Sequence, residues 1–187
     1  IGLDRRALHL VQVQAAAGNA APVDCRMYIS VYGADDKQER IYTAGTSLSA
    51  GQAHSFNWRV PETDGAPIAA IGFELTDQQR GDGRVYVDTL TWSGAPTTTF
   101  KRPEKGGLVW RRAFVEHVQI FAFRRHAAIA VSHSGGKGIL SQGTRDWVNY
   151  RVSAPVQSNL MTSGGIAARV QGVNRYYALL LCHDGKV

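Results

Sequence analysis

Cysteine is scarce in this chain of 187 residues, which contains only Cys25 and Cys182. Secreted domains held together by disulfide bonds use many more cysteines, so a disulfide-rich scaffold is not indicated. The two cysteines lie in opposite halves of the sequence. We expect two separate buried thiols, although the sequence alone leaves open whether the two halves are joined by a bridge.

Long apolar runs are also missing. No segment approaches the roughly 20 apolar residues that a membrane-spanning helix needs, and no secretory signal stands at the start. We therefore expect no membrane partner. Because Ile1 is not a natural initiator residue, we expect a piece of a longer protein, and the cellular compartment stays open.

The composition, 44% hydrophobic and 19% charged, excludes disorder, collagen and coiled coil.

Motifs for nucleotide binding and hydrolysis are lacking as well. The sequence contains no HExxH, GxxxxGK[ST], GxSxG or GxGxxG pattern and no EF-hand loop. The glycine cluster 134–138 lacks the Ser or Thr and the strand-to-helix context of a phosphate-binding loop, which favours a hairpin turn. The six histidines show no paired metal-ligand spacing. We therefore expect no catalytic residue in this chain.

Positive charge is present but uneven. The net charge of +6 divides into −3 for residues 1–100 (8 basic, 11 acidic) and +9 for residues 101–187 (13 basic, 4 acidic). Such asymmetry predicts two units with different surfaces. The basic pairs at 111–112 and 124–125 point to opposite faces of a strand, so they form no continuous stripe. Nucleic-acid recognition motifs are missing too, so we expect no nucleic-acid partner.

The break between the two units falls in a segment rich in Thr, Pro, Gly and charge, which is typical of an exposed connector. We predict a first domain at 1–96, a linker at 97–107 and a second domain at 108–187.

Both domains are expected to be built from strands, because many segments alternate with period two or are rich in β-branched and aromatic residues. Turn residues separate them every 8–12 positions, which is typical of a sandwich or jelly roll. The sequence thus predicts an all-β chain. The expected strands are 7–13, 26–32, 40–44, 54–60, 68–75 and 84–92, then 108–115, 118–123, 127–132, 147–152, 165–170 and 176–182.

One of these segments, 83–94, carries the main metal candidate. Its alternation makes both faces partly apolar, which predicts a central strand covered on both sides. Asp88 lies among Tyr86, Leu90 and Trp92, where a carboxylate needs a partner. Loops of β-sandwiches often hold Ca²⁺ with Asp side chains. The alternative, solvated turn acids, stays open for the whole set and fits Asp88 least well; the set is Asp35, Asp36, Asp77, Asp82 and Asp88.

Aromatic residues supply the ligand-binding candidates. Exposed Trp and Tyr rings can stack on the C–H faces of sugars, although each ring could instead belong to a sandwich core. Trp58 and Trp147 have polar neighbours in sequence and are the better exposed candidates. With Tyr150 and Arg145, which lie near Trp147, they form the predicted ligand-binding set.

Four segments resemble a known family: 83–96 (GRVYVDTLTWSGAP), 109–114 (VWRRAF), 143–152 (GTRDWVNYRV) and 165–179 (GIAARVQGVNRYYAL). In this order they are similar to the C-terminal region of bacterial ADP-ribosylglycohydrolase-family proteins, and the similarity spans most of residues 25–183. The resemblance implies a galactose-binding-like jelly-roll β-sandwich followed by a concanavalin- or laminin-G-like sandwich, which we expect to be truncated here. It also implies that Asp88, in its Val-x-Val-Asp pattern, is a structural Ca²⁺ ligand.

The resemblance further implies a non-catalytic, carbohydrate-binding accessory region of a hydrolase, whose partners are a glycan and the catalytic domain of the parent chain. Two alternatives stay open. One is a glycoside hydrolase using paired carboxylates, for which the second half offers Glu116 and Asp146. The other is a structural module that packs on a catalytic domain and exposes a large apolar patch.

Overall fold

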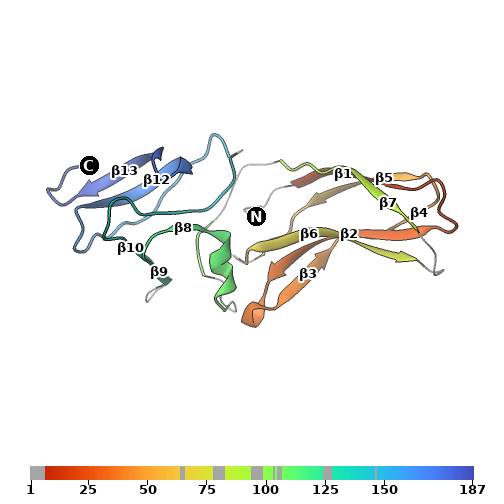
Figure 1. Cartoon of the computed structure of the whole chain (residues 1–187), viewed down its shortest axis with the longest axis horizontal. Coiled ribbons are helices and arrows are strands. Elements are labelled where there is room, and N and C mark those ends of the chain that lie inside the picture. Colours follow the sequence, from red (N-terminus) through yellow and green to blue (C-terminus); the bar gives the residue numbers. More distant parts are fainter. Residues whose placement is uncertain are drawn as a thin grey trace. The chain divides into compact units, whose positions relative to one another are not determined.

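The structure is a computed structural model, and it describes residues 7–63, 66–77, 83–93, 99–102, 104, 107–123, 128–145 and 147–187. These residues form antiparallel strands and two short 3-10 helices, so the predicted all-β class is confirmed. The chain divides into two compact units, residues 1–113 and 114–187, which Figure 1 colours from red to green and from green to blue. We describe each unit by itself.

The first unit contains seven described strands and both 3-10 helices. They are β1 (Ala7–Ala15), β2 (Val23–Tyr32), η1 (Ala34–Asp36), β3 (Gln38–Tyr42), β4 (Thr46–Leu48), β5 (Ala53–Arg59), β6 (Ile68–Asp77), β7 (Val85–Thr89) and η2 (Val109–Ala113).

These strands make two antiparallel sheets. One sheet has the order β5-β1-β7. In the other, β2 pairs with β6 along one side and with β3 and then β4 along the other. Figure 1 shows β2 between β6 and β3. Between β3 and β4, the Thr43 hydroxyl accepts a hydrogen bond from the Met27 amide, so a side chain continues the ladder where the edge strand is interrupted.

A single hydrophobic core joins the two sheets. Alternate residues of β2 (Cys25, Met27 and Ile29) are at most 1% exposed. They belong to one cluster with Val13 of β1 and Phe56 of β5, and so with the other sheet. Two sheets that bury their inner faces against each other form a β-sandwich. The jelly-roll strand order stays a prediction.

Asp36 ties a distant segment to this sandwich. The backbone at Asp35 and Asp36 has positive φ angles of 53° and 62°. The Asp36 carboxylate accepts hydrogen bonds from the amides of Leu108 and Val109, both at 2.9 Å, and so caps the start of η2. These backbone donors lower the pKa of Asp36. The η2 residue Trp110 is buried, and η2 therefore lies with the first unit.

The second unit is built from pairs of strands. They are β8 (Val115–His117), β9 (Ile120–Phe123), β10 (Ile129–Ser132), β11 (Ile139–Ser141), β12 (Ser163–Gly172) and β13 (Arg175–Cys182). Three two-stranded sheets result: β10-β9, β11-β8 and β12-β13. Among the residues that the structure describes here, Phe121 is the one buried hydrophobic side chain. A second, concanavalin-like sandwich stays a prediction.

Several expected strands differ from those observed. All six segments predicted in the first half overlap a strand, and β4 was not predicted. In the second half, residues 108–115 were predicted as a strand but contain η2, because the Asp36 carboxylate accepts a hydrogen bond from the amide at the start of that helix. Residues 147–152 form no strand. The glycine cluster 134–138 is no hairpin turn, since β10 and β11 pair with β9 and β8 rather than with each other.

The environment predicted for β7 was also wrong. Within the described residues, β7 pairs with β1 alone and is an edge strand, not a central one. Its faces are open: Tyr86 is 55% and Val87 52% exposed, and Asp88 is exposed. Asp88 therefore does not lie in the apolar surroundings that its sequence neighbours suggested.

Substitution of Met27 tests the core. The side chain is fully buried at the centre of β2, between the two sheets. We expect Met27→Ala to lower the free energy of unfolding by about 2–5 kcal/mol, because it removes buried surface and leaves a cavity. Denaturant unfolding of both proteins measures the difference. A decrease in the free energy of unfolding of less than about 0.5 kcal/mol, which is typical of a surface substitution, would contradict the placement of Met27 in the core.

The two thiols should differ in reactivity. Both are free, Cys25 is buried in the core of the first unit, and Cys182 is half-buried. Burial raises the pKa of Cys25 to about 11, so almost no reactive thiolate forms near pH 8. We expect a disulfide reagent to label Cys25 only as fast as the first unit opens. Labelling of Cys182→Ser measures Cys25 alone, Cys25→Ser is the matched control, and equally fast native labelling of both variants would overturn the expectation.

Candidate functional site

The outward side of β2 carries a cluster of polar and aromatic side chains. Residues of β2 that alternate with the core positions point away from the core, and the register places them beside residues of β3 and β6. Tyr28 lies opposite Tyr42 and Gly72, and Arg26 lies opposite Glu74. We call this cluster the tyrosine–arginine face. It comprises Arg26, Tyr28, Arg40, Tyr42 and Glu74.

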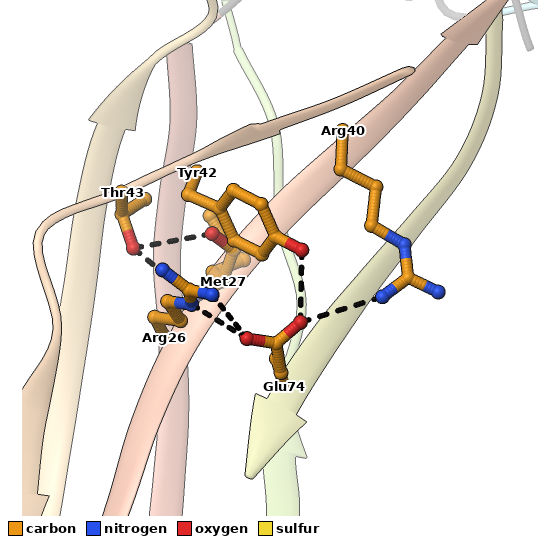
Figure 2. A network of polar contacts seen from close by, with 6 residues as sticks. All are labelled: Arg26, Met27, Arg40, Tyr42, Thr43 and Glu74. Carbon is orange, nitrogen blue, oxygen red and sulfur yellow. Dashed lines mark hydrogen bonds and ion pairs between the residues drawn. The ribbon is translucent and has the colours of Figure 1, made fainter. Parts of the chain in front are cut away.

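Glu74 of β6 is the centre of the face. Its Oε1 accepts a hydrogen bond from Nε of Arg26 at 2.8 Å and a second one from Nη2 of the same guanidinium. Its Oε2 accepts from the Tyr42 hydroxyl at 2.8 Å and lies 3.4 Å from Nη1 of Arg40. Figure 2 shows the carboxylate between these three side chains, which come from β2 and β3.

The guanidinium groups also stack on the tyrosine rings. The Arg26 guanidinium carbon lies 3.8 Å from the centre of the Tyr42 ring, and that of Arg40 lies 4.4 Å from the centre of the Tyr28 ring. The two rings are 5.7 Å apart with an angle of 59° between their planes. Each stacking contact adds an attraction between a guanidinium group and the face of a ring. Hydrogen bonds and stacking thus connect all five side chains, although the Arg26 and Arg40 side chains are 46% and 50% exposed.

A glycine makes room for one of the rings. A Cβ at Gly72 would lie 2.6 Å from the end of the Tyr28 ring, so that ring lies directly over the backbone of β6. Farther along β2, the Ser30 hydroxyl donates to Oε1 of Gln38 at 3.2 Å. Ser30 is buried, so this contact lies beneath the surface, beside Gln38 at the start of β3.

The contacts of Glu74 determine its charge. The Arg26 hydrogen bond, followed by the Tyr42 hydroxyl, holds the pKa of Glu74 below its usual 4.5. The carboxylate is therefore ionised at neutral pH. One carboxylate between two guanidinium groups leaves the face with a net positive charge, together with hydroxyl and guanidinium donors.

The ligand-binding residues predicted from the sequence lie elsewhere. Trp58 of β5 is half-buried and packs against the core of the first unit, so its ring is less open than its polar sequence neighbours suggested. That sequence signal failed because the residues beside Trp58, Asn57 and Arg59, point to the opposite face of the strand. Its binding role stays a prediction.

The other three predicted residues lie within one loop of the second unit. The Trp147 and Tyr150 rings contact each other edge to face, with centres 6.2 Å apart. The Tyr150 hydroxyl accepts a hydrogen bond from the Arg169 amide at 2.6 Å, which fixes the loop to β12. A Cβ at Gly143 would lie 2.8 Å from the Trp147 ring, so the ring lies over that glycine. Arg145 is exposed in the same loop.

The described residues do not provide a set of ligands for the predicted calcium ion. Asp88 is exposed on β7, and no group of three or more His, Cys, Asp or Glu side chains that could hold a metal ion occurs in the described part of the chain. Asp82 lies outside that part, as does the side chain of Asp77. Ca²⁺ needs six to eight oxygen ligands, so a site at Asp88 stays a prediction.

The carboxylate pair that the glycoside-hydrolase alternative would need is placed only in part. Glu116 of β8 is exposed, whereas Asp146 lies outside the described residues, as do Arg124 and Arg125. The tyrosine–arginine face has a single carboxylate, already engaged by Arg26 and Tyr42. It therefore has the donors and acceptors of a binding surface but not the paired carboxylates of a glycoside hydrolase.

Sequence reasoning missed this face, although part of its signal was present. The segment 26–32 was predicted as a strand, and its alternation places Arg26, Tyr28, Ser30 and Tyr32 on one side. What the sequence did not show was the partner register, since Glu74 lies 48 residues beyond Arg26.

Comparison with known proteins found no matching family model, no matching curated protein and no matching solved structure. In the described part of the chain, no helix has the length and apolar character needed to cross a bilayer.

The role of Glu74 in the face can be tested by its pH dependence. Because its pKa is lowered in the folded state, Glu74 stabilises the fold above its unfolded pKa of about 4.5, and this contribution is lost as the pH falls through the lower folded value. We expect Glu74→Gln to lower the melting temperature at pH 7 and to narrow its gap from the parent protein below pH 4. Melting temperatures of both proteins between pH 3 and 7 measure this. A gap independent of pH would contradict it.

Proposed function

We propose that this chain is a non-catalytic binding module and that the tyrosine–arginine face of its first unit binds carbohydrate. The observation that supports this most directly is the fixed arrangement of two tyrosines and two arginines around Glu74 on an exposed sheet face. The proposal agrees with the family resemblance of the sequence, which implies an accessory carbohydrate-binding region of an ADP-ribosylglycohydrolase-like hydrolase.

The chemistry of the face suits a ligand with many hydroxyl groups. Sugars need donors and acceptors at fixed positions and an apolar surface for their C–H groups. Arg40 has five N–H donors, of which Glu74 engages one on Nη1 and the Tyr42 hydroxyl oxygen is a second acceptor, so further donors are left for a ligand. The Tyr hydroxyls can donate or accept. Because the side chains already hold one another, little conformational entropy is lost when a ligand binds.

The ligand class follows from the charge. Two guanidinium groups against one carboxylate favour a sugar that carries a carboxylate or sulfate over an uncharged one. In the other unit, the loop with exposed Arg145 and the half-buried rings of Trp147 and Tyr150 also combines a guanidinium group with aromatic rings, and we include it as a second sugar contact. The catalytic domain of the parent chain is the proposed protein partner.

A structural role is the second candidate. Tyr86, Val87, Leu90 and Trp92 are each at least 42% exposed on β7 and the residues that follow it. An open edge strand with apolar side chains is a common protein interaction site. In this alternative, the module packs on a catalytic domain through β7 and binds no sugar.

A glycan array with matched variants distinguishes these functions. We expect the chain to bind acidic glycans and Arg40→Ala to weaken that binding by at least about tenfold, because the variant lacks the charged donors that would pair with the acidic group of the sugar. Tyr28→Ala should have a similar effect.

Arg59→Ala is the control, because Arg59 is exposed on β5, away from this face. Trp147→Ala and Trp58→Ala test the two tryptophans of the ligand-binding set predicted from the sequence. Absence of glycan binding by the parent chain, or equal losses in Arg40→Ala and Arg59→Ala, would reject the face as a sugar site. Retained binding in Trp58→Ala and Trp147→Ala would reject only those two residues.

A further inference from the structure

Two histidines that are far apart in the sequence meet in the second unit. His117 ends β8, and His133 directly follows β10. Their ring centres are 5.7 Å apart, with an angle of 39° between the ring planes. The strands bring them together because β9 pairs with β10 and β8 pairs with β11, so both residues flank the same glycine-rich loop, 134–138.

The hydrogen bond of His133 defines which of its nitrogens carries a proton. Nε2 lies 2.7 Å from the carbonyl oxygen of Gly135. A carbonyl oxygen only accepts, so Nε2 is the donor and carries the hydrogen. In the neutral ring, Nδ1 then carries a lone pair. Nδ1 is buried and has no hydrogen-bond partner among the residues that the structure describes.

This arrangement is the one found in histidines that bind metal ions. Such a histidine commonly donates its second ring N–H to a carbonyl or carboxylate, which orients the ring and directs the other lone pair at the ion. A buried lone pair without a donor is otherwise unfavourable. The loop that supplies the Gly135 carbonyl is itself held, since the Ser134 amide and hydroxyl both donate to Oε1 of Gln119, at 2.9 and 2.7 Å.

The ring separation is compatible with a shared ion. Two imidazoles bound to one tetrahedral ion at about 2.0–2.1 Å place their ring centres about 5 Å apart. The observed 5.7 Å requires a small side-chain adjustment, and His117 is exposed and can make it. The same exposure leaves room for water at the remaining coordination positions.

We propose that His117 and His133 form a binding site for a divalent transition-metal ion of the Zn²⁺, Ni²⁺ or Cu²⁺ class. Imidazole nitrogen selects these ions over Ca²⁺ and Mg²⁺, which prefer oxygen. With two protein ligands the site binds more weakly than a closed structural zinc site and keeps exchangeable positions for water or a ligand. The ion links the end of β8 to the loop after β10. This inference is independent of carbohydrate binding by the first unit.

Calorimetric titration of the tag-free chain with ZnCl₂ tests the site, using His117→Ala and His133→Ala. We expect the parent chain to bind one equivalent of Zn²⁺ saturably and each variant to bind at least about tenfold more weakly. The control is His183→Ala, which removes an exposed histidine of the same unit next to the half-buried Cys182. This control should bind as the parent does.

Three results would overturn the proposal: no saturable binding by the parent chain, undiminished binding by His117→Ala, or a loss in His183→Ala equal to that in His117→Ala. His117 is exposed, so His117→Ala removes a ligand without disturbing the packing of the unit. This variant therefore decides the outcome even if His133→Ala disturbs the glycine-rich loop. A second measurement follows the imidazole proton resonances. Adding Zn²⁺ should shift the resonances of two histidines in the parent chain. In each variant, the resonances of the remaining histidine of the pair should not shift.

Discussion

The register of β2 determines both the core of the first unit and its candidate binding surface. Residues at odd positions, such as Met27 and Ile29, fill the space between the sheets, while Arg26 and Tyr28 face outward. Because side chains alternate along a strand, a slip of one residue would bury the arginine and expose the core. The pairing of Arg26 with Glu74 and of Tyr28 with Tyr42 is possible only in the register that also buries Met27. Folding and surface chemistry are therefore specified together.

Local patterns predicted much of the first unit. Alternation in 26–32 and 68–75 marked β2 and β6, because each strand has one face against the core. The partners across strands could not be predicted, since Arg26, Tyr42 and Glu74 come together only through pairing between distant segments. The same limit explains η2. Its valine and tryptophan favour a strand, but the Asp36 carboxylate, 73 residues before Val109, supplies the cap for a helical turn.

The two units differ in how their strands are supported. In the first, two sheets share one core, so every strand contributes to the burial of its neighbours. In the second, the described strands form two-stranded pairs, and Leu179 of β13 is 57% exposed. A two-stranded sheet without a shared core is marginally stable in water. Local contacts such as the Tyr150–Arg169 and Gln119–Ser134 hydrogen bonds therefore matter more there than comparable contacts do in the sandwich.

The Asp36 cap bears on how the protein can be divided for study. Composition places the natural cut within 97–107, but a fragment that stops there loses Trp110, and Asp36 loses the amides of Leu108 and Val109 as donors. The backbone at Asp35 and Asp36 would keep its strained left-handed conformation without the bonds that offset it. A separately expressed first half should therefore extend to Ala113, six residues beyond the glycine that ends the apparent linker.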